Sequence, residues 1–202
     1  MKNDNTKFDN KTELHQEWLG KLQDFFAEYR YIPTYEYMGT SFGIGAKSRV
    51  SKLIKLLKTE GFLEDGPDKN LMPGSRFFER PLSHTTVQAG LMTPSFAEGV
   101  DLVKIDDILV RKPSITELIP VRGDSMIDKG IFDGDTVIVE KRPLANIGDI
   151  VVAIIENKFT IKTLGKEKDQ FVLIPANPDF ETIRPKESFY IFGVVTGLFR
   201  KF

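Results

Sequence analysis

Apolar residues recur at spacings of three and four between residues 13 and 29, which is the pattern of an amphipathic helix. The hydroxyl of Thr34 can cap a helix N-terminus, so a second helix is predicted over residues 35–41. After a turn that contains two glycines, a third helix is predicted over about residues 46–59. Its expected buried face consists of Val50, Leu53, Ile54 and Leu57.

The period changes after Gly61, which is placed to end the third helix. The next residues predict a two-stranded wing. It would consist of an apolar start at residues 62–64, a turn rich in Asp, Gly, Pro and Asn at 65–70, and an apolar segment that ends near Phe77-Phe78. Three helices followed by a wing predict a small winged helix-turn-helix domain. Residues 1–11 are polar and are expected to form a frayed, flexible tail.

Short β-type runs separated by turn residues dominate the second half of the chain. They cover 115–121, 136–140, 150–155, 159–164, 171–175 and 189–198. The predicted class is therefore α+β in two domains. The predicted divisions are a tail at 1–11, the winged helix-turn-helix at 12–80, a linker at 81–99 and a mostly β domain at 100–202.

Composition narrows the chemistry. The 202 residues are 41% hydrophobic, which suffices for one or two compact domains. Because the chain has no cysteine, disulfides, thiolate zinc sites and cysteine nucleophiles are excluded, and two histidines disfavour a histidine-rich metal centre. No apolar run is long enough for a signal peptide or a membrane span, so we expect a cytoplasmic protein with no membrane partner.

The net charge of −1 conceals a local basic patch. No acidic residue lies between Glu36 and Glu60, whereas five basic residues do. Such a patch on one helix attracts a phosphate backbone and fits a recognition helix in the major groove of double-stranded DNA, although a solvated helix face would look the same by charge alone. The expected DNA-contacting residues are Lys47, Ser48, Arg49, Ser51, Lys52 and Lys55.

A second candidate site pairs Ser125 with Lys162. A serine hydroxyl needs a base to become nucleophilic, and His84 is the one imidazole in this half of the chain. A lysine can act as that base only when neutral, and Lys162 follows an apolar strand whose surroundings could depress its pKa from about 10.4. The residues alone leave two plainer interpretations open, a solvent-facing strand lysine and a turn serine.

Five blocks in order carry a family resemblance: Ala89-Gly90, Arg122–Asp128, Ile131–Asp135, Gly148–Val151 and Phe159–Lys162. Together they resemble the LexA/UmuD family of self-cleaving Ser/Lys (S24-type) proteins, from about residue 81 to the end. The C-terminal half is closest to UmuD, including Ile174–Asn177 and Phe192–Val195. Residues 32–64, by contrast, are similar to the LexA DNA-binding domain.

The resemblance implies a role for each matched residue. It implies Ser125 as nucleophile, Lys162 as general base, and backbone N–H groups at Asp124 and Ser125 as an oxyanion hole. The scissile bond would join Ala89 to Gly90. The implied protein is an SOS-response repressor that binds operator DNA as a homodimer and is inactivated when a RecA filament on single-stranded DNA promotes its autocleavage. The resemblance implies no cofactor. Because the outward residues of the third helix differ from those of well-known LexA recognition helices, the resemblance does not imply which operator sequence this protein binds.

Two other functions compete. One is a UmuD-like accessory subunit of an error-prone DNA polymerase, and the other is a signal-peptidase-like protease acting on other proteins. Two further motifs carry little weight. Residues 45–48 break the spacing of a phosphate-binding loop, and Asp124, Asp128, Asp133 and Asp135 lack the spacing of a calcium loop, so no metal site is predicted. His84 is interpreted as a surface residue.

Overall fold

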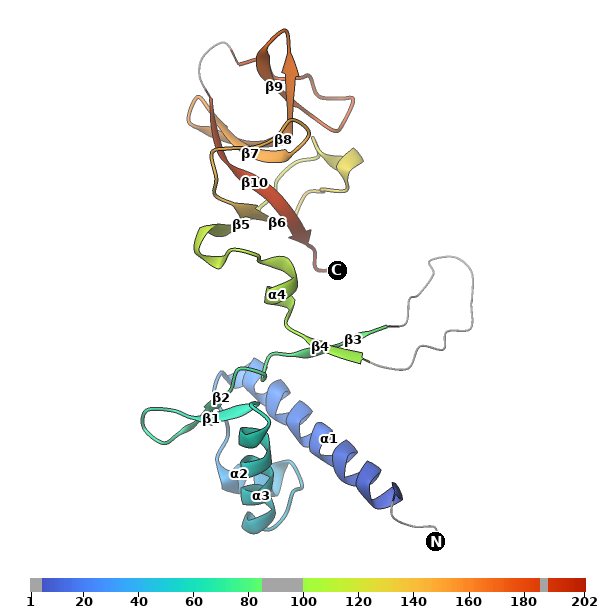
Figure 1. Ribbon diagram of the computed structural model, residues 1–202, viewed down its shortest axis with the longest axis vertical. Coiled ribbons are helices and arrows are strands. Elements are labelled where there is room, and N and C mark those ends of the chain that lie inside the picture. The colour runs from blue at the N-terminus through green and yellow to red at the C-terminus, as the bar shows by residue number, and fades with distance from the viewer. Residues whose placement is uncertain (1–4, 85–99, 186–188) are drawn as a thin grey trace. The chain divides into compact units, whose positions relative to one another are not determined.

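The structure is a computed structural model that describes residues 5–84, 100–185 and 189–202, with backbone alone for residues 5–13. The chain forms two compact units, Met1–Lys104 and Ile105–Phe202 (Figure 1). The first unit contains the helices α1, α2 and α3, and the second contains a six-stranded sheet.

The three helices are α1 (Asn5–Tyr29), α2 (Tyr35–Ser41) and α3 (Lys47–Thr59), and all three predicted helices are confirmed. The Thr34 hydroxyl accepts a hydrogen bond from the Tyr37 N–H at 3.2 Å and caps α2 as predicted. The expected tail needs correction, because α1 begins at Asn5 and includes most of residues 1–11. An existing helix extends at little cost, so a polar segment without an apolar stripe can continue it.

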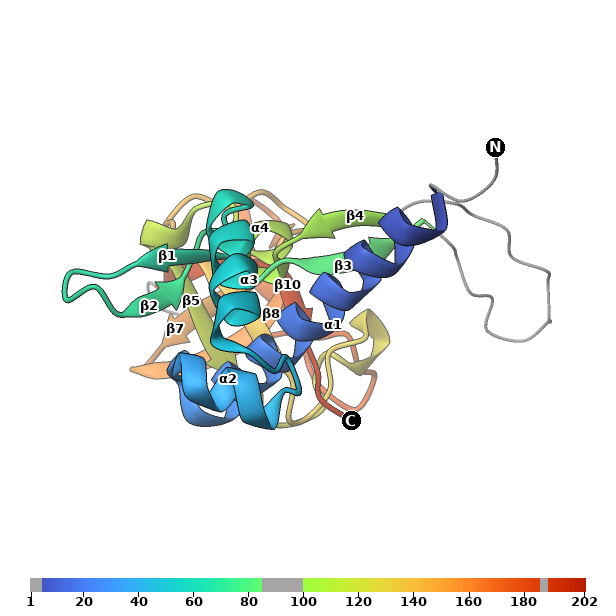
Figure 2. The ribbon, with the colours of Figure 1, turned by 90° about the horizontal axis from the view of Figure 1, so that it is seen from below.

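The helices enclose an apolar core. The helices α1, α2 and α3 lie beside one another (Figure 2). All four residues of the predicted inner face of α3 are buried, and they pack with Leu22 of α1 and Met38 of α2. Gly43 and Gly45 have φ of 71° and 85°, so the link between α2 and α3 uses conformations that favour glycine. Gly61 likewise has φ of 80° at the end of α3.

A two-stranded hairpin follows α3. Its strands are β1 (Leu63–Asp65) and β2 (Leu71–Pro73), paired antiparallel. The prediction that the second strand runs to Phe77-Phe78 is wrong, because β2 ends at Pro73. Phe77 lies in the following turn and is buried in the helical core, so its apolar character reflects packing against helices.

Two more strands of the first unit pair with each other, β3 (Arg80–Ser83) and β4 (Val100–Val103). Their register joins Ser83 to Val100, so the two ends of the intervening segment lie beside each other. In the structure, the first unit ends at Lys104, after β4. The predicted domain boundary lay before residue 100, so residues 100–104 were expected in the second domain. Strand pairing with β3 groups β4 with the first unit.

The second unit is built on one antiparallel sheet in the order β5-β6-β10-β7-β8-β9. All six predicted strands are present, with small shifts at their ends. They are β5 (Thr116–Pro120), β6 (Thr136–Glu140), β7 (Ile150–Ile155), β8 (Lys158–Glu167), β9 (Gln170–Ile174) and β10 (Tyr190–Phe199). Short helical segments are α4 (Ile105–Leu109), η1 (Pro113–Ile115) and η2 (Ile127–Lys129).

Both faces of the central strands are covered by apolar clusters. On β7, Val152 belongs to one cluster, whereas Val151 and Ala153 belong to the other, as the alternation of side chains along a strand requires. The neighbouring strand β8 is exposed at both ends and buried in its middle, where the lysine of the predicted site lies.

Candidate active site

Lys162 lies on β8, opposite Val151 of β7. Lys162 is only 6% exposed, although lysine side chains are usually in contact with solvent. Burial lowers the pKa of Lys162 from its usual 10.5, because a buried site disfavours the charged form. The sequence left open whether Lys162 faces solvent. The structure shows that it does not.

The Lys162 side chain meets Ser125 from a distant part of the chain. Its Nζ lies 2.6 Å from the Ser125 Oγ, and the two residues are 37 positions apart. The same nitrogen donates to the Ile161 carbonyl at 2.9 Å and lies 3.3 Å from the Thr160 hydroxyl. A neutral amine at this distance can accept the serine proton, so the arrangement can generate an alkoxide nucleophile.

The segment that carries Ser125 is held on both sides. Before it, the Gly123 N–H donates to Asp133 Oδ1 at 2.7 Å, and Gly123 has φ of 89°. After it, the Ala176 N–H donates to the Ser125 carbonyl at 2.8 Å. The side chain of Asn177 donates to the Asp124 carbonyl at 3.1 Å. These contacts fix the backbone at the residue whose hydroxyl faces Lys162.

The backbone N–H groups of Asp124 and Ser125 are the expected donors of an oxyanion hole. Within the described residues, neither group donates a hydrogen bond to another part of the protein. Two adjacent donors beside a reactive hydroxyl can receive a developing negative charge. The geometry therefore permits the expected role.

Among the described residues, the side chains of two of the four clustered aspartates accept hydrogen bonds. Asp133 accepts from Gly123, and the buried Asp135 accepts from the Phe132 N–H and from the guanidinium of Arg200. In the described part of the chain, no group of three or more His, Cys, Asp or Glu side chains is placed to hold a metal ion. Asp133 and Asp135 thus shape the loop that lies against the serine segment.

The expected scissile bond between Ala89 and Gly90 lies outside the described residues. In the sequence, β3 ends at Ser83, before this bond, and β4 begins at Val100, after it. His84 is exposed, as expected, and its Nε2 lies 3.0 Å from Asp101 Oδ2. His84 therefore has a surface hydrogen-bond partner from β4.

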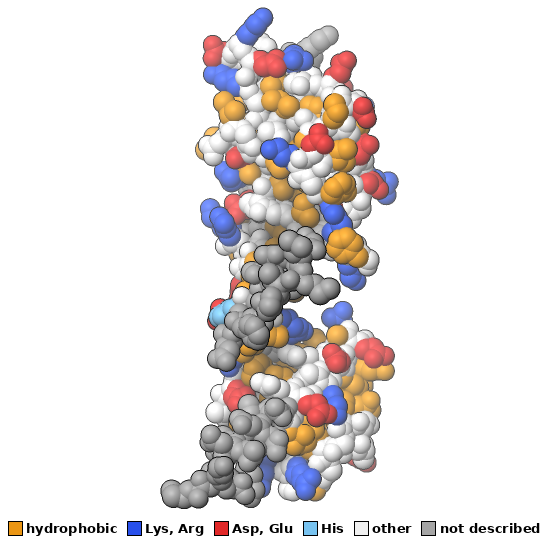
Figure 3. Space-filling model, turned by 90° about the vertical axis from the view of Figure 1, so that its right-hand side faces the viewer, with side chains coloured by type: hydrophobic (Ala, Val, Ile, Leu, Met, Phe, Trp, Pro, Cys, Tyr) orange, Lys and Arg blue, Asp and Glu red, His pale blue; other side chains and the backbone are white. Residues whose placement is uncertain are grey.

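The residues predicted to contact DNA share one property: all are exposed on α3. These residues are Lys47, Ser48, Arg49, Ser51, Lys52 and Lys55. The aliphatic residues between them are buried, so the helix presents a basic and hydroxyl-bearing face to solvent. On the face of the second unit seen in Figure 3, by contrast, basic side chains lie among acidic ones.

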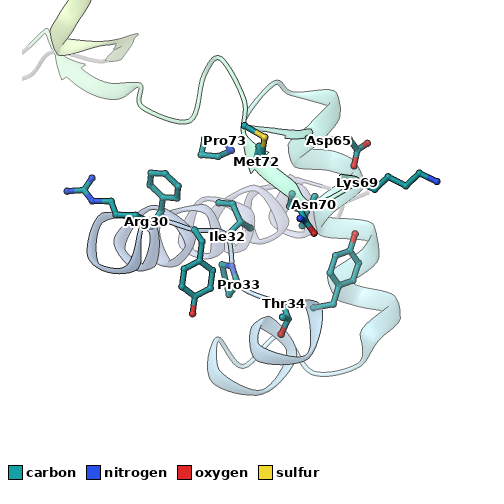
Figure 4. Close-up of a pocket in the computed structure, with 13 residues that line it drawn as sticks. Arg30, Ile32, Pro33, Thr34, Asp65, Lys69, Asn70, Met72 and Pro73 are labelled. Atoms are coloured by element: carbon teal, nitrogen blue, oxygen red, sulfur yellow. The ribbon is translucent and has the colours of Figure 1, made fainter. Parts of the chain in front are cut away.

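A separate hollow of about 700 Å³ lies in the first unit between the α1–α2 link and the β1–β2 hairpin (Figure 4). Its lining includes Ile32, Pro33 and Met72, and is mainly apolar. The side chains of Arg30 and Lys69 extend away from it in opposite directions. The sequence pattern gave no indication of this hollow, because its walls come from separate elements.

Sequence reasoning also missed Asn177 and Arg200 as parts of the site's framework. Asn177 belongs to the Ile174–Asn177 block that carried the UmuD resemblance, so the signal was present without an assigned role. Arg200 gave no such signal, since it is one charged residue near the chain end. Its partner is known only from the folded arrangement.

Among the described helices, none combines the length and the apolar character that crossing a bilayer requires. Residues 81–196 match the protein family described as Peptidase S24-like. A LexA repressor of Leptospira interrogans is 32% identical over 199 residues, which cover 94% of this chain and 97% of the relative. LexA repressor 2 of Pseudomonas putida is 34% identical over 190 residues, with coverages of 89% and 93%.

The LexA repressor of Acetivibrio thermocellus is 29% identical over 209 residues, again with 94% of this chain and 97% of the relative covered. These matches include the helical unit as well as the sheet, so the likeness concerns the whole architecture. The Peptidase S24-like match also contains both Ser125 and Lys162. The chain therefore belongs to the family of LexA repressors, with a Peptidase S24-like domain in its C-terminal part.

Proposed function

We propose that this protein is an SOS-type transcriptional repressor that inactivates itself by cutting its own chain between Ala89 and Gly90. The observation that carries the proposal is the 2.6 Å separation of the buried Lys162 Nζ from the Ser125 Oγ. Relatives named LexA repressor match 94% of the chain, which supports a repressor rather than an isolated peptidase.

The proposed reaction begins with a proton transfer. Neutral Lys162 takes the proton of the Ser125 hydroxyl as Oγ forms a bond to the carbonyl carbon of Ala89. The C–N bond to Gly90 then breaks, and the Gly90 nitrogen takes the proton from Lys162. Water next attacks the Ala89–Ser125 ester, giving its OH to Ala89 and returning a proton to Ser125 through Lys162.

Negative charge develops on the Ala89 carbonyl oxygen during both attacks. Among the described residues, the N–H groups of Asp124 and Ser125 donate to no acceptor, which supports their assignment as the oxyanion hole, since donors already fixed in place need no reorganisation. The proposal requires no cofactor and no metal.

The pairing of β3 with β4 supports the proposal that the scissile bond is brought to Ser125 by the segment that joins these two strands. Ser83 at the end of β3 pairs with Val100 at the start of β4, so the two residues that flank the expected cleavage region are neighbours. We propose that this segment carries Ala89 to Ser125, and that a RecA filament favours the arrangement in which it does so. Such a partner shifts a population and adds no catalytic group.

The first unit is proposed to be a winged helix-turn-helix, with α3 in the major groove and β1–β2 as the wing. Its exposed basic and hydroxyl side chains suit phosphates and base edges. Two copies joined through their second units would place one α3 on each operator half-site, and linkage of the two contacts raises affinity. Cutting at Ala89 would separate the DNA-binding unit from the dimerising unit, in the cytoplasm where the DNA lies.

The alternative function is a UmuD-like accessory role for an error-prone DNA polymerase. The near-complete coverage of LexA repressors favours the repressor, because the helical unit is included in that match. Failure of the intact protein to bind damage-inducible promoters, combined with normal self-cleavage, would favour the polymerase role. Cleavage of added protein by the fragment 90–202 would instead favour a protease acting on other substrates.

The test is incubation of the purified full-length protein over a pH series up to about 10. Because a higher pH increases the neutral fraction of Lys162, self-cleavage should accelerate and yield two fragments whose masses meet at Ala89/Gly90. Ser125→Ala and Lys162→Ala should abolish the fragments. The matched changes at the exposed residues Ser114→Ala and Lys158→Ala should not. Equal yields from Ser125→Ala and the unaltered protein would exclude the mechanism.

A further inference from the structure

The carbonyl of the peptide bond between Asp124 and Ser125 accepts a hydrogen bond from a buried side chain, that of Asn177. Asn177 is 5% exposed, and its Nδ2 donates to the Asp124 carbonyl at 3.1 Å. Its Oδ1 accepts from the Asp179 N–H at 2.9 Å. Because one end of the amide is a donor and the other an acceptor, these two bonds define the orientation of the side chain.

A planar trans peptide links the directions of its two polar groups. The carbonyl of Asp124 and the N–H of Ser125 belong to the same plane and point in opposite directions. The same carbonyl accepts from the Ile127 N–H at 3.2 Å, so Asn177 and Ile127 together fix where the Ser125 N–H points, and Asn177 supplies the shorter of the two bonds. That N–H finds no acceptor among the described residues.

The neighbouring peptide is fixed from the same segment. The Ala176 N–H donates to the Ser125 carbonyl at 2.8 Å, and the Ala176 carbonyl accepts from the Asp128 N–H at 2.8 Å. Ala176 and Asn177 thus hold the peptide units on both sides of the Ser125 α-carbon. The Ala176 bonds use backbone atoms alone, so Asn177 is the residue of this pair whose contribution depends on its side chain.

We propose that Asn177 is a positioning residue for self-cleavage: its amide aims the Ser125 N–H at the oxyanion that forms on the scissile carbonyl. The proposal rests on the proposed function, in which that N–H is an oxyanion donor. The Asn177 side chain bonds to Asp124 and Asp179, whereas Lys162 Nζ bonds to Ser125, Thr160 and Ile161. The effect of Asn177 is on the stability of the transition state and not on the supply of the neutral amine.

The experiment measures the first-order rate of self-cleavage against pH in the full-length Asn177→Ala protein. The rate at high pH, where Lys162 is neutral, should fall by about tenfold or more, less than the roughly 100- to 1000-fold that follows removal of an oxyanion donor. The pH at which the rate is half-maximal should stay unchanged. A residue that merely supported the fold would shift this midpoint, because the midpoint depends on the burial of Lys162.

A second variant guards against misfolding. Asn177→Asp keeps an oxygen that can accept from the Asp179 N–H but replaces the donor to Asp124, and its rate at high pH should also fall. Asn146→Ala is the matched control, since Asn146 is exposed in the same unit and its side chain donates to no described residue. Thermal unfolding of every variant identifies the temperatures at which all are folded, and the rates are compared there.

Two different failures can be told apart. If unaltered protein cleaves with Ser125 dependence while both Asn177 variants keep its rate at high pH, the positioning role is wrong and the proposed function stands. A joint shift of midpoint and unfolding temperature in Asn177→Ala would also overturn the positioning role. If the unaltered protein forms no Ser125-dependent fragments at any pH, the proposed function itself fails.

Discussion

Asp135, which is buried, forms an ion pair with the partly exposed side chain of Arg200, 65 positions away in the chain. The Asp135 side chain is fully buried, and Arg200 donates to it from Nε at 2.5 Å and from Nη2 at 2.7 Å. Arg200 also donates to the Gly130 carbonyl, and its guanidinium lies 4.5 Å from the centre of the Phe132 ring. The pair therefore fastens the loop of residues 130–135, whose Asp133 holds Gly123 beside the serine segment.

Arg200→Met should lower the free energy of unfolding, because it leaves the Asp135 carboxylate buried without its cation. The exposed pair of Arg184 with Glu167 supplies a matched control, since exposed pairs contribute little. We expect the loss for Arg200→Met to be several times that for Arg184→Met in urea unfolding at pH 7. Equal losses would mean that burial of Asp135 carries no penalty.

The same variant should change the dependence of stability on acid. The Arg200 side-chain hydrogen bonds hold the pKa of Asp135 below its usual value. A lowered carboxyl pKa adds stability that is complete above the unfolded pKa of about 3.9 and is lost as the pH falls through the folded pKa. The stability difference between the unaltered protein and Arg200→Met should therefore narrow below about pH 4, and a difference independent of pH would contradict this coupling.

Lys162→Met should raise the free energy of unfolding at pH 7 while abolishing self-cleavage. Burial lowers the pKa of Lys162, and each unit of lowering costs about 1.4 kcal/mol of stability at a pH where the amine is charged. Stability of the unaltered protein rises with pH between the folded pKa and the unfolded value of 10.5, because the unfolded chain binds more protons there. The advantage of Lys162→Met should therefore shrink as the pH approaches 10.5.

The control for that measurement is Lys158→Met, at the exposed start of the same strand. It removes the same charge without removing a buried one, so its stability should follow that of the unaltered protein across the pH series. If Lys162→Met proves less stable than the unaltered protein at pH 7, the packing of the lysine stem outweighs its desolvation. The functional reading of its lowered pKa would then lose its energetic support.

Lys47→Ala combined with Arg49→Ala should weaken binding to a damage-inducible promoter. If both side chains meet phosphates, the slope of log affinity against log salt should decrease in magnitude by about 2, since each phosphate contact contributes about 0.9. Lys166→Ala with Lys168→Ala changes the charge equally in the second unit and should leave the slope unchanged. Unchanged gel-shift behaviour for the α3 variant would assign its basic residues to an ordinary solvated face.

Much of the fold follows from local pattern. The inner face of α3 and the six strands of the sheet were predictable because helical and strand periodicities expose or bury side chains residue by residue. Phe77 shows the limit of such patterns, since its burial against helices resembles a strand in sequence. The extension of α1 to Asn5 was not predicted either, because a polar helical segment has no apolar stripe to reveal it.

The sequence by itself determined which chemistry was excluded, since the chain has no cysteine and two histidines, and left Ser125 and Lys162 as one candidate pair; the family motifs then implied their catalytic roles. Only the tertiary structure decided that Lys162 is buried and lies 2.6 Å from Ser125, and that Asn177 and Arg200 support the loops around them. The physical reason is that burial and hydrogen-bond partners depend on residues brought together from distant strands, whereas composition and periodicity record only what each segment contributes alone.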